Sequence, residues 1–172
     1  MATMKGVVSD RIRLRRLHER GKYDSESIYG ILDAMPICSI GYTFDDFPFV
    51  TSTLQWREGN YVYWHGSSAS RMLRAVDTAK VCLNVSILDG FVMARSGMHH
   101  SVNYRSVMMF GKAHKVTDPH EKEERLKVFV DSLFPGRWDS LRPATSQEIK
   151  ATTVLSMPID EAVAKVRSGQ PS

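Results

Sequence analysis

The sequence predicts a mainly β fold: a small six-stranded antiparallel barrel with flanking helices. Short β-rich runs separated by turn residues fill its first half, similar runs recur in its middle, and few helical stretches lie between them. The chain has 172 residues, of which 42% are hydrophobic and 24% are charged. These values are typical of a globular protein, and we expect a single domain over residues 1–172.

The predicted strands begin with PICSIGYTF, FVTSTLQW and YVYWHG, an antiparallel meander whose turns are DDFP and REGN. KVCLNVSIL and FVMARS continue the pattern, and Asp89-Gly90 between them predicts a hairpin turn. RSVMMFGKAHKV and TVLSMPI are the later strands, and Gly111 in the first of them indicates a bend or bulge. Residues 160–172 are expected to form a loosely held tail.

Four stretches have helical features. SESIYGILDAM follows a possible N-cap at Asp24, SSASRMLRAVDTA has helical spacing, and SQEIKAT indicates one further turn. The clearest helix is DPHEKEERLKVFVDSLF, where Asp118 is the N-cap and Pro119 the first helical residue. Its apolar stripe consists of Leu126, Phe129, Val130 and Leu133.

The net charge of +4 is concentrated at the N-terminus, where residues 1–22 hold seven basic and two acidic residues. This basic arm has no interleaved aromatic residues, so we expect it to lie on a partner subunit; binding to nucleic acid is the alternative. No apolar run approaches the roughly 20 residues that cross a bilayer, and no secretory signal is visible. Cys38 and Cys82 lie in apolar runs as small buried residues. We therefore expect a cytoplasmic protein without nucleic-acid or membrane partners.

The stretch YVYWHGSSASRMLRAV, residues 61–76, contains the candidate ligand-binding residues. A strand ends at His65-Gly66, a loop of small residues follows, and a helix begins near Ser70 and Arg71. Backbone N–H groups at a helix start, the Ser67 and Ser70 hydroxyls and the fork of Arg71 together suit a phosphate. The alternative is a serine-rich turn that caps a helix beside a solvated arginine.

Four blocks of the sequence resemble the pyridoxamine 5′-phosphate oxidase-like FMN-binding split-barrel superfamily, in particular its branch of nitroimidazole-resistance proteins. Their order and spacing cover nearly the whole chain from about residue 24. The blocks are PICSIGYTFDDFPFVTSTLQW, YVYWHGSSASRM, VCLNVSILDGFVMARSGMHHSVNYRSVMMFGKAHKV and ATTVLSMPIDEAVAKVRSG. The resemblance implies a split barrel and a homodimer with FMN at its interface.

The resemblance also implies the flavin-binding residues. Ser70 and Arg71 match the pair that holds the FMN phosphate, and His65 and Gly66 match the His-Gly that closes the strand beside the flavin. Two backbone segments complete the implied site: Thr51, Ser52, Thr53 and Leu54 along the isoalloxazine ring, and Tyr104, Arg105 and Ser106 facing the flavin across the interface.

The chain departs from the oxidase itself, because Met72 follows Arg71 where that enzyme has lysine, and its C-terminal Trp and Arg are missing. We therefore expect a flavin-dependent oxidoreductase acting on another small molecule, with a nitroaromatic compound as one candidate. His65 is the candidate catalytic residue, since an imidazole carries protons near neutral pH. The alternative is a non-catalytic FMN-binding or haem-handling protein. No metal-ion site is expected, because neighbouring His99 and His100 point to opposite faces of a strand.

Overall fold

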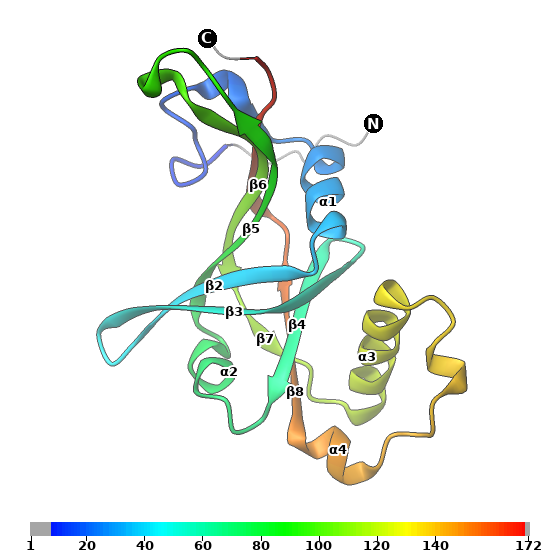
Figure 1. The fold of residues 1–172 in the computed structure, drawn as a ribbon. Helices are drawn as coiled ribbons and strands as arrows, with labels where there is room; N and C mark the ends of the chain where they lie inside the picture. The colour runs from blue at the N-terminus through cyan, green and yellow to red at the C-terminus, as the bar shows by residue number, and fades with distance from the viewer. Residues whose placement is uncertain (1–7, 171–172) are drawn as a thin grey trace.

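The computed structural model describes residues 8–170, and their strands form one nine-stranded sheet (Figure 1). The strand order is β1-β9-β6-β5-β2-β3-β4-β8-β7, and all these neighbours pair antiparallel. This confirms the predicted mainly β fold. The strands are β1 (Gly21–Lys22), β2 (Ile37–Phe44), β3 (Phe47–Glu58), β4 (Tyr61–Ser67), β5 (Lys80–Val92), β6 (Ser101–Lys112), β7 (His114–Lys115), β8 (Thr152–Pro158) and β9 (Glu161–Arg167).

The number of strands differs from the six expected. Of the three additional strands, β1 contains only two residues and is too short to show an alternating pattern, and β7 is the end of the run RSVMMFGKAHKV, which was predicted as one strand but is interrupted at Ala113. The third is β9, which lies in the segment expected to be a loosely held tail. Ala162, Val163 and Ala164 of β9 are buried, and the strand pairs with β6 and β1. The tail prediction was therefore wrong for residues 161–167.

The predicted helices are all present: α1 (Ser25–Ala34), α2 (Arg71–Val76), α3 (Pro119–Leu133) and α4 (Ser146–Ala151). Asp24 and Asp118 cap α1 and α3 by accepting backbone N–H bonds, as the sequence predicted. Three short 3₁₀ helices complete the described structure: η1 (His18–Arg20), η2 (Gly97–His99) and η3 (Trp138–Ser140). Within residues 8–170, no helix is long and apolar enough to span a membrane.

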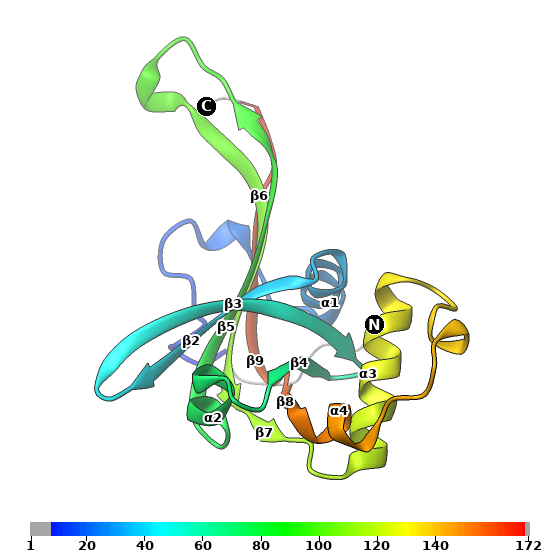
Figure 2. The same ribbon diagram turned by 60° about the horizontal axis from the view of Figure 1, so that its bottom comes forward.

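Asp89-Gly90 does not form the expected hairpin turn. β5 runs through both residues, and the pairing register with β6 shifts between Leu88 and Gly90. Asp89 is thus the extra residue of a bulge, where Arg105 of β6 binds its carboxylate at 2.8 Å. The chain instead turns after Val92, so β5 and β6 form a long protruding hairpin (Figures 1 and 2). Gly111 is paired with Val81 without a register shift, and a Cβ there would meet the Met157 sulfur at 2.7 Å.

The described part of the basic arm packs on its own chain. Ile12 is buried, and Ser9 and Arg11 both bind the carboxylate of Glu161 at the start of β9. η1 and β1 then lead the chain along the edge of the sheet. The contact of the arm with a partner subunit stays a prediction, and residues 1–7 lie outside the described part.

The main core fills the space between one face of the sheet and helices α1 and α2. Trp64, Leu83, Met109 and Leu155 are fully buried there. β4 alternates across the sheet, so Val62 and Trp64 enter this core while Tyr63 joins a second cluster on the opposite face. The second cluster lies under α3, which together with α4 covers that side of β4 and β8 (Figures 1 and 2).

Lys122 is the one residue of α3 that is buried, which is unusual for a charged side chain. Its ammonium group donates to the carbonyl oxygens of Ile149, at 3.1 Å, and Thr152, at 2.9 Å. These carbonyls belong to the end of α4, where helix geometry leaves acceptors without partners. Lys122 therefore joins α3 to the end of α4.

We expect Lys122→Met to lower the free energy of unfolding by about 2 kcal/mol, because two buried carbonyls lose a charged donor. Urea unfolding monitored by circular dichroism measures this change. Lys150→Met removes an exposed lysine of α4 and is the matched control, with an expected change within about 0.5 kcal/mol. Equal destabilisation by the two substitutions would contradict a bracing role for Lys122.

Candidate functional site

The predicted phosphate loop lies between β4 and α2. Ser70 is the N-cap of α2, and its hydroxyl accepts a bond from the Leu73 N–H at 3.5 Å. The Ser67 hydroxyl accepts from the Ala69 N–H at 3.2 Å, so the loop is held by its own serines. A Cβ on Gly66 would meet the Leu73 side chain at 3.0 Å, which shows how closely the helix approaches the strand. Both hydroxyls keep a proton to donate to an anion.

Arg71 follows the cap and is exposed. Its guanidinium lies 4.6 Å from the ring centre of Phe49 and 5.6 Å from that of Phe44, both on the β2–β3 hairpin. No carboxylate pairs with Arg71 within residues 8–170, so these rings orient its charge without neutralising it. An oriented cation beside two serine hydroxyls is the arrangement that a phosphate group requires.

The segment Thr51–Leu54 runs along β3, and its side chains alternate between the two faces. The Thr51 hydroxyl lies 3.3 Å from the hydroxyl of Tyr42, a core residue, and Tyr42 stacks on Phe49. Thr51 thus shares the face on which Arg71 contacts Phe49. Ser52 and Leu54 are exposed on the other face, where Ser52 is paired with Ser39. β2 pairs with one edge of this segment and β4 pairs with β3 only from Gln55 onward, so the other backbone edge and one outer face of the segment remain for a ligand.

Tyr104, Arg105 and Ser106 lie in β6 on the long hairpin. Tyr104 and Ser106 share a face, whereas Arg105 points to the opposite one and makes three hydrogen bonds to the Asp89 carboxylate. These bonds raise the pKa of Arg105 and lower that of Asp89. Within one chain, only two of these three predicted residues can face the same ligand.

His65 lies on the opposite side of β4 from the main core. Its imidazole packs 4.7 Å from the ring centre of Phe129 in α3 and 5.9 Å from that of Trp56. Nδ1 is buried and has no hydrogen-bond partner within the described residues. Burial lowers the pKa of His65 below its ordinary value of 6.5, so the ring is neutral at physiological pH. A neutral imidazole has a lone pair for a metal ion.

A cavity of about 410 Å³ opens in front of His65, a size typical of ligand sites. None of the phosphate-loop serines lines it, and Arg71 does not either. Three of the four residues in the predicted apolar stripe of α3, Leu126, Phe129 and Val130, line this cavity and are only half-buried. Its apolar lining consists of Leu126, Phe129, Val130, Trp138, Leu141, Ala144 and Ile149.

One ion pair lies among the residues that line this cavity. Arg142 binds the Glu148 carboxylate through two nitrogens, at 2.6 and 2.9 Å. Glu148 also completes a capping box with Thr145 at the start of α4. These donors lower the pKa of Glu148 to about 2. The cavity thus combines an apolar wall, a neutral imidazole and an exposed arginine.

The buried imidazole predicts a pH dependence of stability. The folded protein keeps His65 neutral, whereas the unfolded chain binds a proton at the ordinary pKa of 6.5. The contribution of the neutral His65 imidazole to the free energy of unfolding is therefore fully present above pH 6.5. It is lost as the pH falls through the lowered pKa that His65 has in the folded protein. We expect His65→Phe to flatten this part of the pH profile, measured as thermal midpoints of the protein without added ligands. His114→Phe, at an exposed position of β7, should leave the slope unchanged.

Comparison with known proteins identifies the family. A family model described as pyridoxamine 5′-phosphate oxidase matches residues 24–166. The chain belongs to this family. Its members share the mainly antiparallel fold seen here, which confirms the resemblance inferred from the sequence blocks. No curated protein sequence matches the chain.

Two solved structures from the pyridoxamine 5′-phosphate oxidase family are close relatives. Flavocytochrome Anf3 from Azotobacter vinelandii is 48% identical, with a TM-score of 0.92 over 95% of this chain and 77% of that one. An FAD- and haem-binding protein from Mycobacterium smegmatis is 31% identical, with a TM-score of 0.85 over 89% of this chain and 76% of that one.

A third structure, from Bacteroides thetaiotaomicron, is named for 5-nitroimidazole antibiotic resistance. It is 21% identical, with a TM-score of 0.69 over 85% of this chain and 86% of that one. At this identity the likeness shows the shared fold alone.

The cavity in front of His65 was missed in the sequence. The stripe Leu126–Phe129–Val130–Leu133 was recognised as a helix face, but a stripe does not tell whether it covers a core or a ligand. Trp138, Leu141 and Arg142 come from an irregular stretch without periodicity. Within residues 8–170, no group of three or more His, Cys, Asp or Glu side chains could hold a metal ion.

Proposed function

We propose that this protein binds both a flavin nucleotide and haem and works as an oxidoreductase that moves electrons between them and a small molecule. The observation that carries the proposal is the imidazole of His65, which lines an apolar cavity and whose buried Nδ1 has no hydrogen-bond partner among residues 8–170. A buried polar atom without a partner is costly, and an imidazole in an apolar pocket is a common axial ligand of haem iron. The two close relatives are called a flavocytochrome and an FAD- and haem-binding protein.

The residues around the cavity fit haem. Half-buried apolar side chains of α3 suit the porphyrin faces, and His65 offers a neutral ring nitrogen. Arg142 is exposed and can turn from Glu148 to a haem propionate, since arginine binds carboxylates through two bonds. When bound, haem supplies one-electron chemistry at iron. His65 would thus serve as a metal ligand rather than as the predicted proton carrier.

The flavin is proposed for the opposite side, with a phosphate on Ser70 and Arg71 and the ring along Thr51–Leu54. Ser70 caps α2, and Arg71 is oriented by Phe49 and unpaired within the described part of the chain. This site accepts the phosphate of FMN, the predicted cofactor, and equally the inner phosphate of FAD. The two cofactors would lie near each other, because the Thr53 hydroxyl donates to the His65 carbonyl at 3.4 Å.

A homodimer is part of this proposal. Large apolar side chains are exposed on the two protruding hairpins: Phe47 is 69% exposed, Phe91 75% and Met98 92%. Large apolar side chains exposed on protruding hairpins favour burial against a second protein chain. We expect sedimentation of the flavin-loaded protein at twice the mass of one chain. Sedimentation of the flavin-loaded protein as a monomer would contradict the dimer.

The absorbance spectrum of the purified protein tests the proposal directly. Protein produced with haem supplied is expected to show a Soret band together with the flavin absorbance. Release of both chromophores and mass spectrometry would then distinguish FMN from FAD. A flavin spectrum without haem, unchanged after titration with haemin, would contradict haem binding and leave the flavin assignment standing.

A further inference from the structure

A line of aromatic rings leads from His65 to the surface of the protein. The imidazole centre lies 5.9 Å from the ring centre of Trp56, and Trp56 stacks on Tyr63 at 5.6 Å with an angle of 18° between the rings. Tyr61 follows, with its ring centre 6.4 Å from that of Tyr63. Each separation is within the range of direct contact between rings. The line of rings therefore connects the wall of the His65 cavity with a side chain that is 46% exposed.

The β3–β4 hairpin holds these rings in place. Tyr61, Tyr63 and His65 alternate along β4 and so share one face of it. Trp56 of β3 is paired directly with Tyr63. Both of these inner rings are buried, so solvent does not reach the line between its two ends.

The chemistry of these side chains suits the passage of single electrons. Tryptophan and tyrosine are, with cysteine and methionine, the side chains that lose one electron most readily. An oxidised indole is strongly acidic at its N–H group and needs a base nearby. The Trp56 N–H donates to the Glu58 carboxylate at 2.8 Å, and Arg125 binds the other oxygen of that carboxylate. Glu58 can therefore accept the indole proton when Trp56 is oxidised and return it when Trp56 is reduced.

The outer end of the line lies at the turn between β3 and β4, where a small molecule can reach Tyr61. Arg57 and Glu58 carry the charges of this turn, and both are paired: Arg57 with Asp33 at 2.7 Å, and Glu58 with Arg125. Because these charges compensate each other, the turn does not favour a charged ligand. A neutral phenol, which gives up an electron and a proton together, fits this surface.

We propose that Tyr61 is a second oxidation site, where neutral phenols give up electrons that pass through Tyr63 and Trp56 to the cavity. The oxidant is a hydroperoxide, and its reduction in the cavity rests on the haem site proposed above. As its O–O bond breaks, the hydroperoxide ROOH takes up two electrons and two protons and leaves as ROH and water. Two phenol molecules supply them one after the other. Each phenol loses the hydrogen atom of its hydroxyl group and leaves as a phenoxyl radical.

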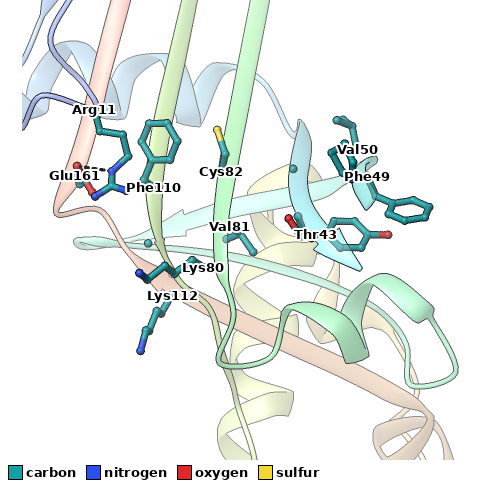
Figure 3. A pocket seen from close by; sticks show the side chains of 14 residues that line it. Arg11, Thr43, Phe49, Val50, Lys80, Val81, Cys82, Phe110, Lys112 and Glu161 are labelled. Carbon is teal, nitrogen blue, oxygen red and sulfur yellow. Dashed lines mark hydrogen bonds and ion pairs between the residues drawn. The ribbon is translucent and has the colours of Figure 1, made fainter. Parts of the chain in front are cut away.

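Cys82 is a readily oxidised side chain outside the line of rings. It lies on β5 and lines a second cavity, of about 490 Å³, where Figure 3 shows it beside Phe110. β5 pairs with β2 and β6 and not with the hairpin that carries the rings. Burial raises the pKa of Cys82, so its thiol stays protonated and reacts slowly with peroxide. Oxidation of Cys82 therefore reports direct attack by peroxide and is an internal control.

The first test locates the radical in haem-loaded protein. Hydrogen peroxide is added with a nitroso spin trap and without a phenol, and peptide mass spectrometry identifies the labelled residues. The wild type is expected to carry the label on Tyr61. Tyr63→Phe removes one hydroxyl group and keeps the ring contacts. It should lose most of the Tyr61 label, while its Soret band and its Cys82 oxidation stay unchanged.

Tyr29→Phe is the matched control. Tyr29 lies beside the same turn, where its hydroxyl donates to Asn60 at 2.7 Å, but it is not part of the line of rings. This variant should keep the label on Tyr61. Labelling of Tyr61 that persists in Tyr63→Phe, or a label found only on Trp138 at the cavity wall, overturns the proposal.

The second test uses a phenol coupled to dextran, which is too large for the His65 cavity of about 410 Å³. Tyr61→Phe and Tyr63→Phe should each lower its oxidation by hydrogen peroxide on the order of tenfold or more, and Tyr29→Phe should not. Equal oxidation by all three variants overturns the surface site while the haem proposal stands. Failure of haem uptake in the Soret titration instead contradicts the haem site, and the surface site with it, so the two failures are distinguishable.

Discussion

Replacing His65 with phenylalanine is expected to abolish haem uptake and to leave flavin affinity unchanged. Phenylalanine keeps the contacts with Phe129 and Trp56 but has no nitrogen to bind iron. Loss of the iron-binding imidazole should lower haem affinity on the order of 100-fold or more. Substitution of residues that only hydrogen-bond to a metal ligand already lowers metal affinity by roughly 10–100-fold. Titration with haemin, followed at the Soret band, measures the loss.

The control for this variant is His114→Phe, which removes an exposed histidine of β7 and should leave haem uptake intact. Flavin fluorescence measured on the same samples separates a lost ligand from a damaged fold. Haem binding by the His65 variant with unaltered affinity would show that another residue holds the iron.

Arg71→Ala is expected to weaken flavin binding by about 1.5–3 kcal/mol, or roughly 10–150-fold in Kd, the usual contribution of a hydrogen bond to a charged group. The Arg71 guanidinium is oriented by Phe49 and forms no ion pair with a carboxylate among residues 8–170, so phosphate binding breaks no existing ion pair. The substitution therefore removes the full interaction between the guanidinium and the phosphate. Equilibrium titration with FMN and with FAD measures the effect.

Arg74→Ala removes a second exposed arginine from the same helix and should change flavin affinity little. Riboflavin, which has no phosphate, should bind the wild type and the Arg71 variant equally. Equal affinity of the wild type for riboflavin and FMN would exclude a phosphate site in this loop.

Local signals in the sequence were sufficient for much of the fold. Asp45 and Asp46 take positive φ values of 50° and 59° in the predicted turn between β2 and β3, as a tight hairpin requires. The caps at Asp24 and Asp118 fixed the starts of α1 and α3. Each of these signals acts within a few residues, so it can be recognised without knowledge of the tertiary structure.

Signals that depend on distant residues could not be recognised. Ala162 and Ala164 have weak strand propensity, and β9 forms because β6 and β1 supply its hydrogen bonds from far away in the sequence. Asp89-Gly90 has the composition of a turn, but Arg105 on the next strand binds Asp89 and the strand continues. In both cases tertiary contacts override the local preference.

The candidate site was only partly predictable. Ser70 and Arg71 lie at the start of a helix as expected, because strand, loop and helix follow each other directly in the chain. The direction of His65 was not predictable, since β4 is covered on both faces and His65 lies on the face under α3. A sequence pattern cannot tell which covered face belongs to a ligand.

The stretch from α3 through α4 supplies all the residues that line the cavity in front of His65, except His65 itself and Thr152. This stretch is continuous in sequence and lies between β7 and β8. Every residue predicted to contact flavin lies outside that stretch. A relative in which this piece was shortened or rebuilt would keep the sheet and the phosphate loop intact. Evolution can therefore reshape or remove the cavity in front of His65 without redesigning the phosphate loop, because the two are encoded in separate stretches of the chain.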